Sequence, residues 1–184
     1  MEERTLDSRQ IYEGRIVDLR VDTVALPGGR ETTREVVTHP DCVAIVAIDA
    51  ADNVILVRQF RHAVGKELLE IPAGGIEPGE EALDSALREL AEETGYTAGK
   101  MERLGGFYGS PGYSTEFLHL FLATELEPTP CRAPEDEIIE VVPIPLAKIP
   151  GLIVSGKLCD AKSIAGFFAF FAQSQRLWKN EGED

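Results

Sequence analysis

A short acidic segment has the spacing needed to bind a divalent cation. It begins at Gly74, and its charged side chains include Glu80, Arg88, Glu89, Glu92 and Glu93. If residues 80–94 form a helix, Glu89, Glu92 and Glu93 lie at i, i+3 and i+4 on one face. Three carboxylates so close repel one another. A Mg2+ ion, which prefers oxygen ligands and keeps waters that can bridge to phosphates, removes that repulsion.

The residues around this segment predict how it is positioned. Residues 71–75, Ile-Pro-Ala-Gly-Gly, are a short apolar run whose glycines let the backbone approach a ligand closely. Pro78-Gly79 predicts a turn before the helix, and Gly95 predicts its left-handed end. The apolar residues recur at helical spacing and predict one buried face of the helix. They are Leu83, Ala86, Leu87, Leu90 and Ala91.

A run of acidic residues is most often a solvated helix face, so the three glutamates alone would not establish a metal site. The full pattern, G-x5-E-x7-R-E-x-x-E-E-x-G over residues 74–95, resembles the Nudix box. The chain therefore resembles the Nudix hydrolases over nearly its whole length. Tyr96 stands where an aliphatic residue is commonest in the box, and we interpret it as a packing residue.

The resemblance implies roles for several residues. Metal ligands would be Glu89, Glu92, Glu93 and the backbone carbonyl of Ala73, with Mg2+, or Mn2+ in its place, as the cofactor. A water activated by metal and carboxylate would attack phosphorus, so Glu89 and Glu93 count as catalytic. Arg88 counts with them because it can hold a neighbouring carboxylate in place.

An acidic loop at residues 134–140 resembles the family loop that carries a general base and a further metal ligand. Aligned on the apolar residues that follow, Glu135 matches the base and Glu137 the ligand. A base beside cations must stay ionised to accept a proton, and the metal charge favours that. The register could differ by one or two residues, and the alternative is a plain solvated loop.

Features outside the box resemble the ADP-ribose pyrophosphatases of this family. Pro111 looks like their marker, although Ser-Pro-Gly is also ordinary turn chemistry. Arg58 and Arg61 could bind phosphates or ribose hydroxyls, or could instead pair with surface acids. Glu116 matches an acid that helps to shape the substrate site. These residues predict hydrolysis of ADP-ribose to AMP and ribose 5-phosphate.

Two alternatives stay open at this point. Another nucleoside diphosphate sugar, such as GDP-mannose, would fit the same catalytic centre, because the box does not encode contacts to the base or the terminal sugar. A nucleotide-sensing domain without activity is the second alternative. Such domains usually lose box carboxylates, whereas all of them are present here.

Composition narrows the class of partner. The net charge of −14, without a cluster of lysines and arginines, argues against nucleic-acid binding. The longest apolar stretch, near residues 164–172, is too short to span a bilayer, and no signal peptide is visible. Three widely separated cysteines argue against a disulfide framework. We expect a cytoplasmic enzyme with a small nucleotide substrate and no membrane or nucleic-acid partner.

The 184 residues predict one sizeable core and a small accessory element. We expect an N-terminal antiparallel β element over residues 1–39, with strands at 11–26 and 31–38 joined by a turn at 27–29. A Nudix domain over 40–184 would be an α/β/α sandwich with a mixed sheet. Its expected elements are a hairpin of 43–48 with 54–57, strands near 102–109, 116–124 and 138–144, and the helix over 80–94.

The last helix should begin at Asp160 as its N-cap and turn its aromatic and aliphatic residues to the core. Those residues are Ile164, Phe167, Phe168 and Phe171. The N-terminal element is too small to bury its faces alone. In the ADP-ribose pyrophosphatases, which this chain resembles, the N-terminal elements of two subunits pair across a two-fold axis. We therefore expect a homodimer.

Overall fold

The computed structural model describes residues 2–130 and 138–179, with side chains as far as residue 174. The chain forms two compact units. The first comprises the residues up to Asp41 together with Phe107–Phe117, and the second comprises Cys42–Gly106 and the residues from Leu118 onward. The predicted domain boundary between residues 39 and 40 stays a prediction. It differs from the two compact units in that residues 107–117 belong to the first unit.

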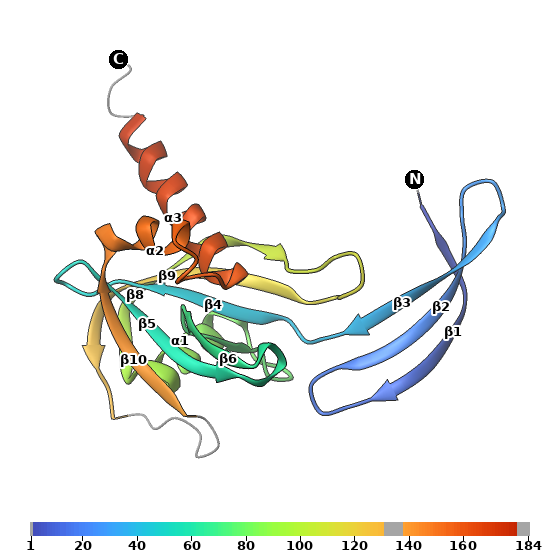
Figure 1. The fold of residues 1–184 in the computed structure, drawn as a ribbon, viewed down its shortest axis with the longest axis horizontal. Coiled ribbons are helices and arrows are strands. Elements are labelled where there is room, and N and C mark those ends of the chain that lie inside the picture. Colours follow the sequence, from blue (N-terminus) through green and yellow to red (C-terminus); the bar gives the residue numbers. More distant parts are fainter. Residues whose placement is uncertain (1, 131–137, 180–184) are drawn as a thin grey trace. The chain divides into compact units, whose positions relative to one another are not determined.

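The first unit is built on an antiparallel sheet of order β1-β2-β3 (Figure 1). Its strands are β1 (Arg4–Glu13), β2 (Asp18–Ala25) and β3 (Glu31–Thr38). The turn between β2 and β3 uses Gly28 and Gly29 at φ 97° and 85°, values that favour glycine. The antiparallel N-terminal element and its glycine turn are therefore as predicted.

The single strand expected over residues 11–26 is wrong, because the chain reverses between β1 and β2. The Gly14 N–H donates to the Val17 carbonyl at 3.2 Å and to the Asp18 carboxylate at 3.1 Å, which closes a tight turn. Every residue of β1 is exposed. A strand without a buried face leaves little apolar alternation in the sequence, so β1 has no periodic signal from which it could be predicted.

The strands of the second unit form two sheets (Figure 1). One sheet has the order β7-β4-β9-β8, and the other has the order β10-β5-β6. Strands β4 and β9 are parallel, whereas β4 with β7 and β5 with both its neighbours are antiparallel. The mixed character predicted from sequence is thus confirmed. The strands are β4 (Cys42–Ala47), β5 (Asn53–Arg61), β6 (Lys66–Glu70), β7 (Ala73–Gly75), β8 (Tyr96–Tyr108), β9 (Phe117–Pro128) and β10 (Ile139–Pro145).

The hairpin expected around Asp49–Asn53 is only partly present. The Asp49 N–H donates to the Asn53 carbonyl at 2.9 Å, and a bridge joins Ile48 to Val54. Beyond that bridge β4 and β5 enter different sheets. Strand β4 pairs with β7 and β9, and β5 pairs with β10 and β6.

The described helices are α1 (Ala82–Thr94), α2 (Ile149–Val154) and α3 (Ala161–Lys179), and short 3-10 turns occur at η1 (His62–Val64) and η2 (Leu146–Lys148). As predicted, Asp160 caps α3, since its carboxylate accepts the Ser163 N–H at 3.0 Å. None of the helices in the described ranges is long and apolar enough to cross a membrane.

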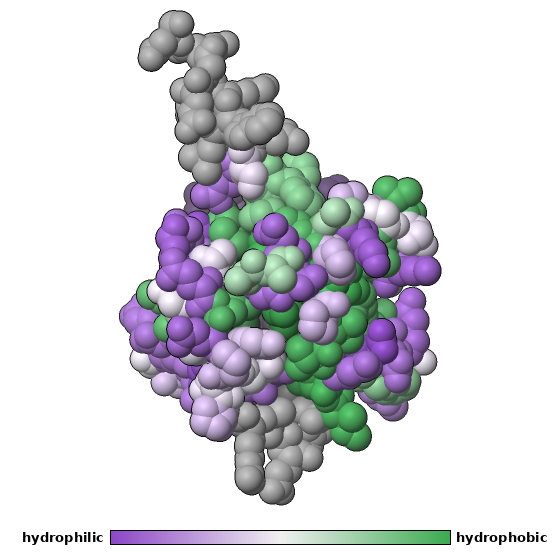
Figure 2. All heavy atoms as spheres, turned by 90° about the vertical axis from the view of Figure 1, so that its left-hand side faces the viewer, coloured by the Kyte–Doolittle hydropathy of each residue, from purple (hydrophilic) through white to green (hydrophobic). Residues whose placement is uncertain are grey.

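The core-facing residues of α3 differ from the prediction. Phe167 is fully buried, but Phe168 is 74% exposed and Ile164 is 37% exposed. Successive helical residues point in different directions, so Phe167 and Phe168 cannot both face the sheet. Figure 2 shows hydrophobic side chains at the surface of the second unit, interspersed with hydrophilic ones. Exposed apolar side chains are common on protein surfaces.

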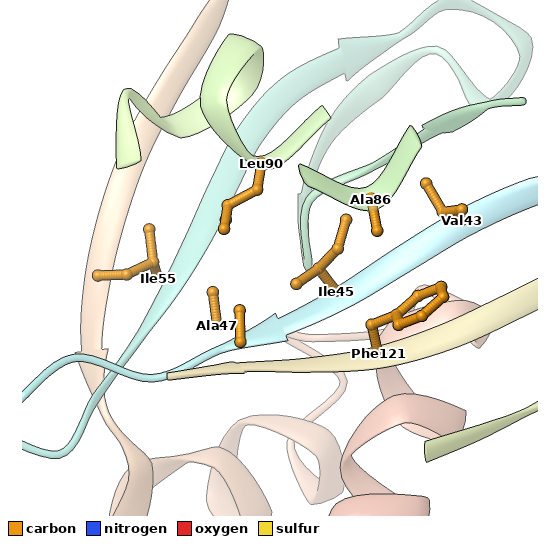
Figure 3. Close-up of a cluster of buried hydrophobic side chains, with 8 residues drawn as sticks. Val43, Ile45, Ala47, Ile55, Ala86, Leu90 and Phe121 are labelled. Atoms are coloured by element: carbon orange, nitrogen blue, oxygen red, sulfur yellow. The ribbon is translucent and has the colours of Figure 1, made fainter. Parts of the chain in front are cut away.

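Strand β4 is buried on both faces, and this makes the second unit a sandwich. Figure 3 shows Ala86 and Leu90 of α1 on one face of β4, pointing toward a cluster that holds Val43, Ile45 and Ala47 of β4 together with Ile55 of β5 and Phe121 of β9. On the other face, Val46 lies against Gly166 of α3, where an added Cβ would come within 3.1 Å of the Val46 side chain. Alternate residues of β4 therefore face α1 and α3, and the predicted α/β/α sandwich is confirmed.

The box helix is shorter and its buried stripe narrower than predicted. Helix α1 begins at Ala82 instead of near residue 80. Ala86 and Leu90 are fully buried, but Leu83 is 45% exposed. Leu83 lies in the first turn of α1, where its neighbour Ala82 is the residue that packs against the core cluster.

Candidate active site

The glycine loop before α1 is attached directly to the core strand. Strand β7 pairs with β4 so that Ala73 lies opposite Ala44 and Gly74 opposite Val43. The Ile45 N–H also donates to the Pro72 carbonyl at 2.9 Å. Because β4 is buried on both faces, this loop has a rigid support, which is the condition for a precise site.

Gly74 lies against the carboxylate of Glu89. A Cβ placed on Gly74 would overlap the Glu89 carboxyl group, whereas one on Gly75 would meet nothing within 4 Å. The first glycine of the loop is therefore needed for close approach of a helix side chain. This contact places a predicted metal ligand beside the backbone of Ala73 and Gly74.

Glu93 is held against the same loop. Its carboxylate Oε2 accepts the Ala73 N–H at 3.0 Å, and the residue is only 7% exposed. A buried carboxylate needs hydrogen-bond partners, and the Ala73 amide supplies one. Two predicted ligands, Glu93 and Ala73, are thus neighbours in the structure.

Arg88 joins the remaining acids of the site. Its Nη1 donates to Glu89 Oε1 at 2.7 Å and to Glu92 Oε2 at 3.2 Å. Its Nε and Nη2 each donate to one oxygen of Glu80 at 2.9 Å, and Nη2 also donates to the Gly75 carbonyl at 3.0 Å. Such a planar fork fixes carboxylates geometrically as well as electrostatically.

Glu80 has a structural role that the sequence did not reveal. Its carboxylate accepts the Glu77 N–H at 3.0 Å, and its own N–H donates to the Glu77 carbonyl at 3.0 Å. Glu80 therefore belongs to a turn before α1, which explains the later start of the helix. The hydrogen bonds from Arg88 lower the pKa of Glu80 to about 2 and raise the pKa of Arg88. The pair is fully ionised near neutral pH.

Comparison with known proteins shows the family of this chain. A sequence model described as the NUDIX domain matches residues 38–165. The chain belongs to the Nudix family. A second model, described as the nucleoside diphosphate sugar hydrolase N-terminal domain, matches residues 3–37.

Two curated relatives cover 89% of this chain, and the chain covers 89% of each. One, from Bacillus subtilis (strain 168), is 43% identical over 165 residues and is named ADP-ribose pyrophosphatase. The other, from Bacillus methanolicus, is 40% identical over 165 residues and is named methanol dehydrogenase activator. A crystal structure of an ADP compounds hydrolase has a TM-score of 0.85 at 24% identity. It covers 99% of this chain, which covers 97% of that one. This last likeness shows a shared fold.

The residues present fit a divalent cation. Nudix hydrolases generally need such an ion, and the side chains gathered around Ala73 offer carboxylate oxygens, which suit Mg2+. Glu93 is fixed by the Ala73 amide, and Glu89 is fixed by Arg88 and by its contact with Gly74. Glu92 shares the Arg88 Nη1 group with Glu89. Of the four predicted ligand positions on α1 and β7, Ala73, Glu89 and Glu93 thus meet at the glycine loop, and Glu92 is linked to Glu89 through Arg88.

The two arginines predicted to bind substrate are paired with acids. Arg58 Nη1 donates to Glu140 at 2.8 Å, and both groups are well exposed. Arg61 donates through Nε and Nη2 to the two oxygens of Glu70 at 3.0 and 2.7 Å. The partner of Arg58 is a surface acid, which matches the alternative stated for this residue. The partner of Arg61 is not a surface acid, because Glu70 is only 1% exposed. Their contact with substrate stays a prediction.

Glu70 is a buried acid whose role is not apparent from the sequence. Burial raises its pKa, but hydrogen bonds from Arg61 and Lys162 outweigh that effect and leave the pKa below its usual value. The sequence signal for Glu70 is an acid within the apolar run of residues 68–73. Glutamate is rarely buried unless it is paired, so such an acid indicates a buried ion pair.

The remaining predicted site residues are Pro111, Glu116, Glu135 and Glu137. Pro111 and Glu116 belong to the first unit. Pro111 lies in a turn closed by the Tyr113 N–H and the Ser110 carbonyl at 3.1 Å, and Glu116 lies 3.8 Å from the His39 ring. Glu135 and Glu137 fall at residues 131–137, outside the described residues. The roles of these four Nudix residues stay predictions.

Proposed function

We propose that this Nudix enzyme hydrolyses the pyrophosphate bond of ADP-ribose and releases AMP and ribose 5-phosphate. The observation that carries the proposal is the site on α1, where Glu89 and Glu93 lie against the Gly74 loop and Arg88 holds Glu89 and Glu92. The 43% identity with a protein named ADP-ribose pyrophosphatase supports the choice of substrate.

Each residue of the site has a proposed role. Glu89, Glu92, Glu93 and the Ala73 carbonyl would hold the cation, for which we propose Mg2+, with Mn2+ as a substitute. When bound, the ion supplies a Lewis acid and lowers the pKa of a coordinated water. Arg88 keeps two of the ligands oriented. We propose Glu135 as the general base and Glu137 as a further ligand.

Substrate contacts are proposed for both units. Arg58 and Arg61 offer planar donor groups to phosphates or ribose hydroxyls. Pro111 and Glu116 would shape the substrate site. Binding through either arginine would compete with its present ion pair to Glu140 or Glu70.

We also propose that the enzyme is a cytoplasmic homodimer without nucleic-acid partners. The net charge of −14 disfavours phosphate backbones as ligands. All residues of β1 are exposed, and an isolated small sheet is marginally stable, which supports pairing of the N-terminal element with a second copy.

A substrate panel tests the activity. The purified protein is incubated with Mg2+ and ADP-ribose, GDP-mannose, UDP-glucose, NADH or a diadenosine polyphosphate, and kcat/KM is measured by phosphatase-coupled phosphate release. We expect the highest kcat/KM with ADP-ribose and no turnover when EDTA replaces Mg2+. A higher kcat/KM with GDP-mannose would select the alternative substrate. Binding of ADP-ribose without turnover would indicate a sensing domain.

A further inference from the structure

The backbone just before the glycine loop is attached to α3 through a buried serine. The Ile71 N–H donates to Ser163 Oγ at 2.9 Å, although the two residues are 92 positions apart. Ile71 is 1% exposed and Ser163 is fully buried. A buried backbone N–H needs a partner, and water has no access here. The Ser163 hydroxyl therefore supplies an interaction that the loop requires.

The Ser163 hydroxyl is itself held in one orientation. Its proton is donated to Asp160 Oδ2 at 2.7 Å, and the same carboxylate oxygen accepts the Ser163 N–H at 3.0 Å. With the hydroxyl proton committed to Asp160, a lone pair remains to accept the Ile71 N–H. The first turn of α3 thus presents a fixed acceptor to the loop.

A second attachment joins the same two segments. Lys162 forms an ion pair with Glu70, the residue before Ile71, and with Asp160 at 3.1 Å. Glu70 is 1% exposed and is also paired with Arg61. Both residues that lead into the box are therefore anchored to the start of α3.

The anchored segment continues directly into the site. The Pro72 carbonyl accepts the Ile45 N–H of β4. The Ala73 N–H donates to the Glu93 carboxylate of α1. Three successive residues are thus held by three different elements. A shift at Ile71 would move the Ala73 amide, because few freely rotating bonds separate them.

We propose that Ser163 is a positioning residue for the metal site. Its hydroxyl fixes the 71–73 backbone, and that backbone places the Ala73 amide and carbonyl against Glu93. The inference rests on the proposed function in that it assigns the cation to these residues. Ser163 itself contacts neither substrate nor cation.

The test compares Ser163→Ala with Ser174→Ala in the full-length protein. Ser174 lies on the same helix, is exposed, and donates only to the Phe170 carbonyl at 2.9 Å. Binding of Mn2+ without nucleotide is measured by calorimetry, and deuterium exchange of the Ile71 and Ala73 amides is measured in the metal-free protein. We expect Ser163→Ala to bind Mn2+ about 10-fold more weakly, as is typical for loss of a group that orients a ligand. The Ile71 and Ala73 amides should exchange faster, and Ser174→Ala should match the wild type in both measurements.

The proposal would be overturned if Ser163→Ala binds Mn2+ and exchanges its amides as the wild type does. A lower Tm would not rescue it, because a merely structural role lowers Tm without changing the site of the folded protein. If Ser163→Ala does not fold, Ser163→Cys takes its place. It fills nearly the same space with a weak acceptor, and the same two outcomes decide.

The two proposals fail separately. If the wild type leaves ADP-ribose intact but Ser163→Ala weakens Mn2+ binding and speeds exchange, the proposed substrate is wrong and the positioning role stands. If the wild type cleaves ADP-ribose and Ser163→Ala binds Mn2+ as the wild type does, the activity stands and the positioning role is lost.

Discussion

Gly74 and Glu89 are in direct contact, and the absence of a side chain at Gly74 makes that contact possible. The relationship explains why a glycine must precede a carboxylate on the following helix. A methyl group at residue 74 would occupy the position of the Glu89 carboxyl group. The end of a glutamate side chain is flexible, so the helix would stay in place while the ligand moved.

Gly74→Ala should therefore separate activity from stability. We expect turnover of ADP-ribose to fall by about 10- to 100-fold, the range found when a metal ligand loses its orientation, with little change in Tm. Gly75→Ala is the matched control, because a Cβ there meets nothing within 4 Å. Equal activity of the two variants would show that the Glu89 position is not set by Gly74.

The Arg88–Glu80 pair should make part of the stability depend on pH. The pKa of Glu80 is lowered from 4.5 to about 2 by Arg88, so the folded state favours the charged carboxylate. The contribution of the pair is complete above pH 4.5 and is lost as the pH falls toward 2. The free energy of unfolding of Glu80→Gln should lie below that of the wild type at pH 7, and the two should converge in acid.

Urea denaturation at several pH values measures this difference. Glu77→Gln is the control, because the Glu77 side chain is exposed and only its backbone takes part in the turn. A difference between Glu80→Gln and the wild type that stays constant from pH 7 to pH 3 would rule out the ion pair as its source.

The position of α1 should depend on Leu90. This side chain is fully buried between α1 and β4, and replacement of a buried leucine by alanine costs about 2–5 kcal/mol. Leu83→Ala, on the same helix but at a 45% exposed residue, should cost much less. Urea unfolding of both variants tests the packing, and equal losses would contradict it.

The arrangement of the box side chains on one helix could be predicted because its geometry is local. Once residues 82–94 are helical, the spacing of Glu89, Glu92 and Glu93 places them together without knowledge of the rest of the fold. Gly95 ends the helix at φ 71°, as predicted, because only local backbone conformation is involved.

Contacts between distant segments could not be predicted in the same way. The partner of Arg61 is Glu70 on a neighbouring strand, and the partner of the Ile71 amide is Ser163, far along the chain. Neither choice is visible from spacing, since each depends on how β5, β6 and α3 pack. Likewise, the path of β4 and β5 into different sheets depends on neighbours supplied by later strands.

The central claim is that the carboxylates of α1 carry out ADP-ribose hydrolysis, and Glu93→Gln tests it most directly. AMP release from ADP-ribose is measured for the wild type and the variant at saturating Mg2+, with Asp84→Asn as a control for loss of one charge on the same helix. Glutamine keeps an acceptor for the Ala73 amide but loses the charge that a cation needs.

We expect the wild type and Asp84→Asn to release AMP at similar rates. Glu93→Gln should be slower by about 100-fold or more, which corresponds to roughly 3 kcal/mol for a key electrostatic group. Full activity in Glu93→Gln would show that the catalytic metal site lies elsewhere, and absence of AMP with the wild type would contradict the proposed substrate.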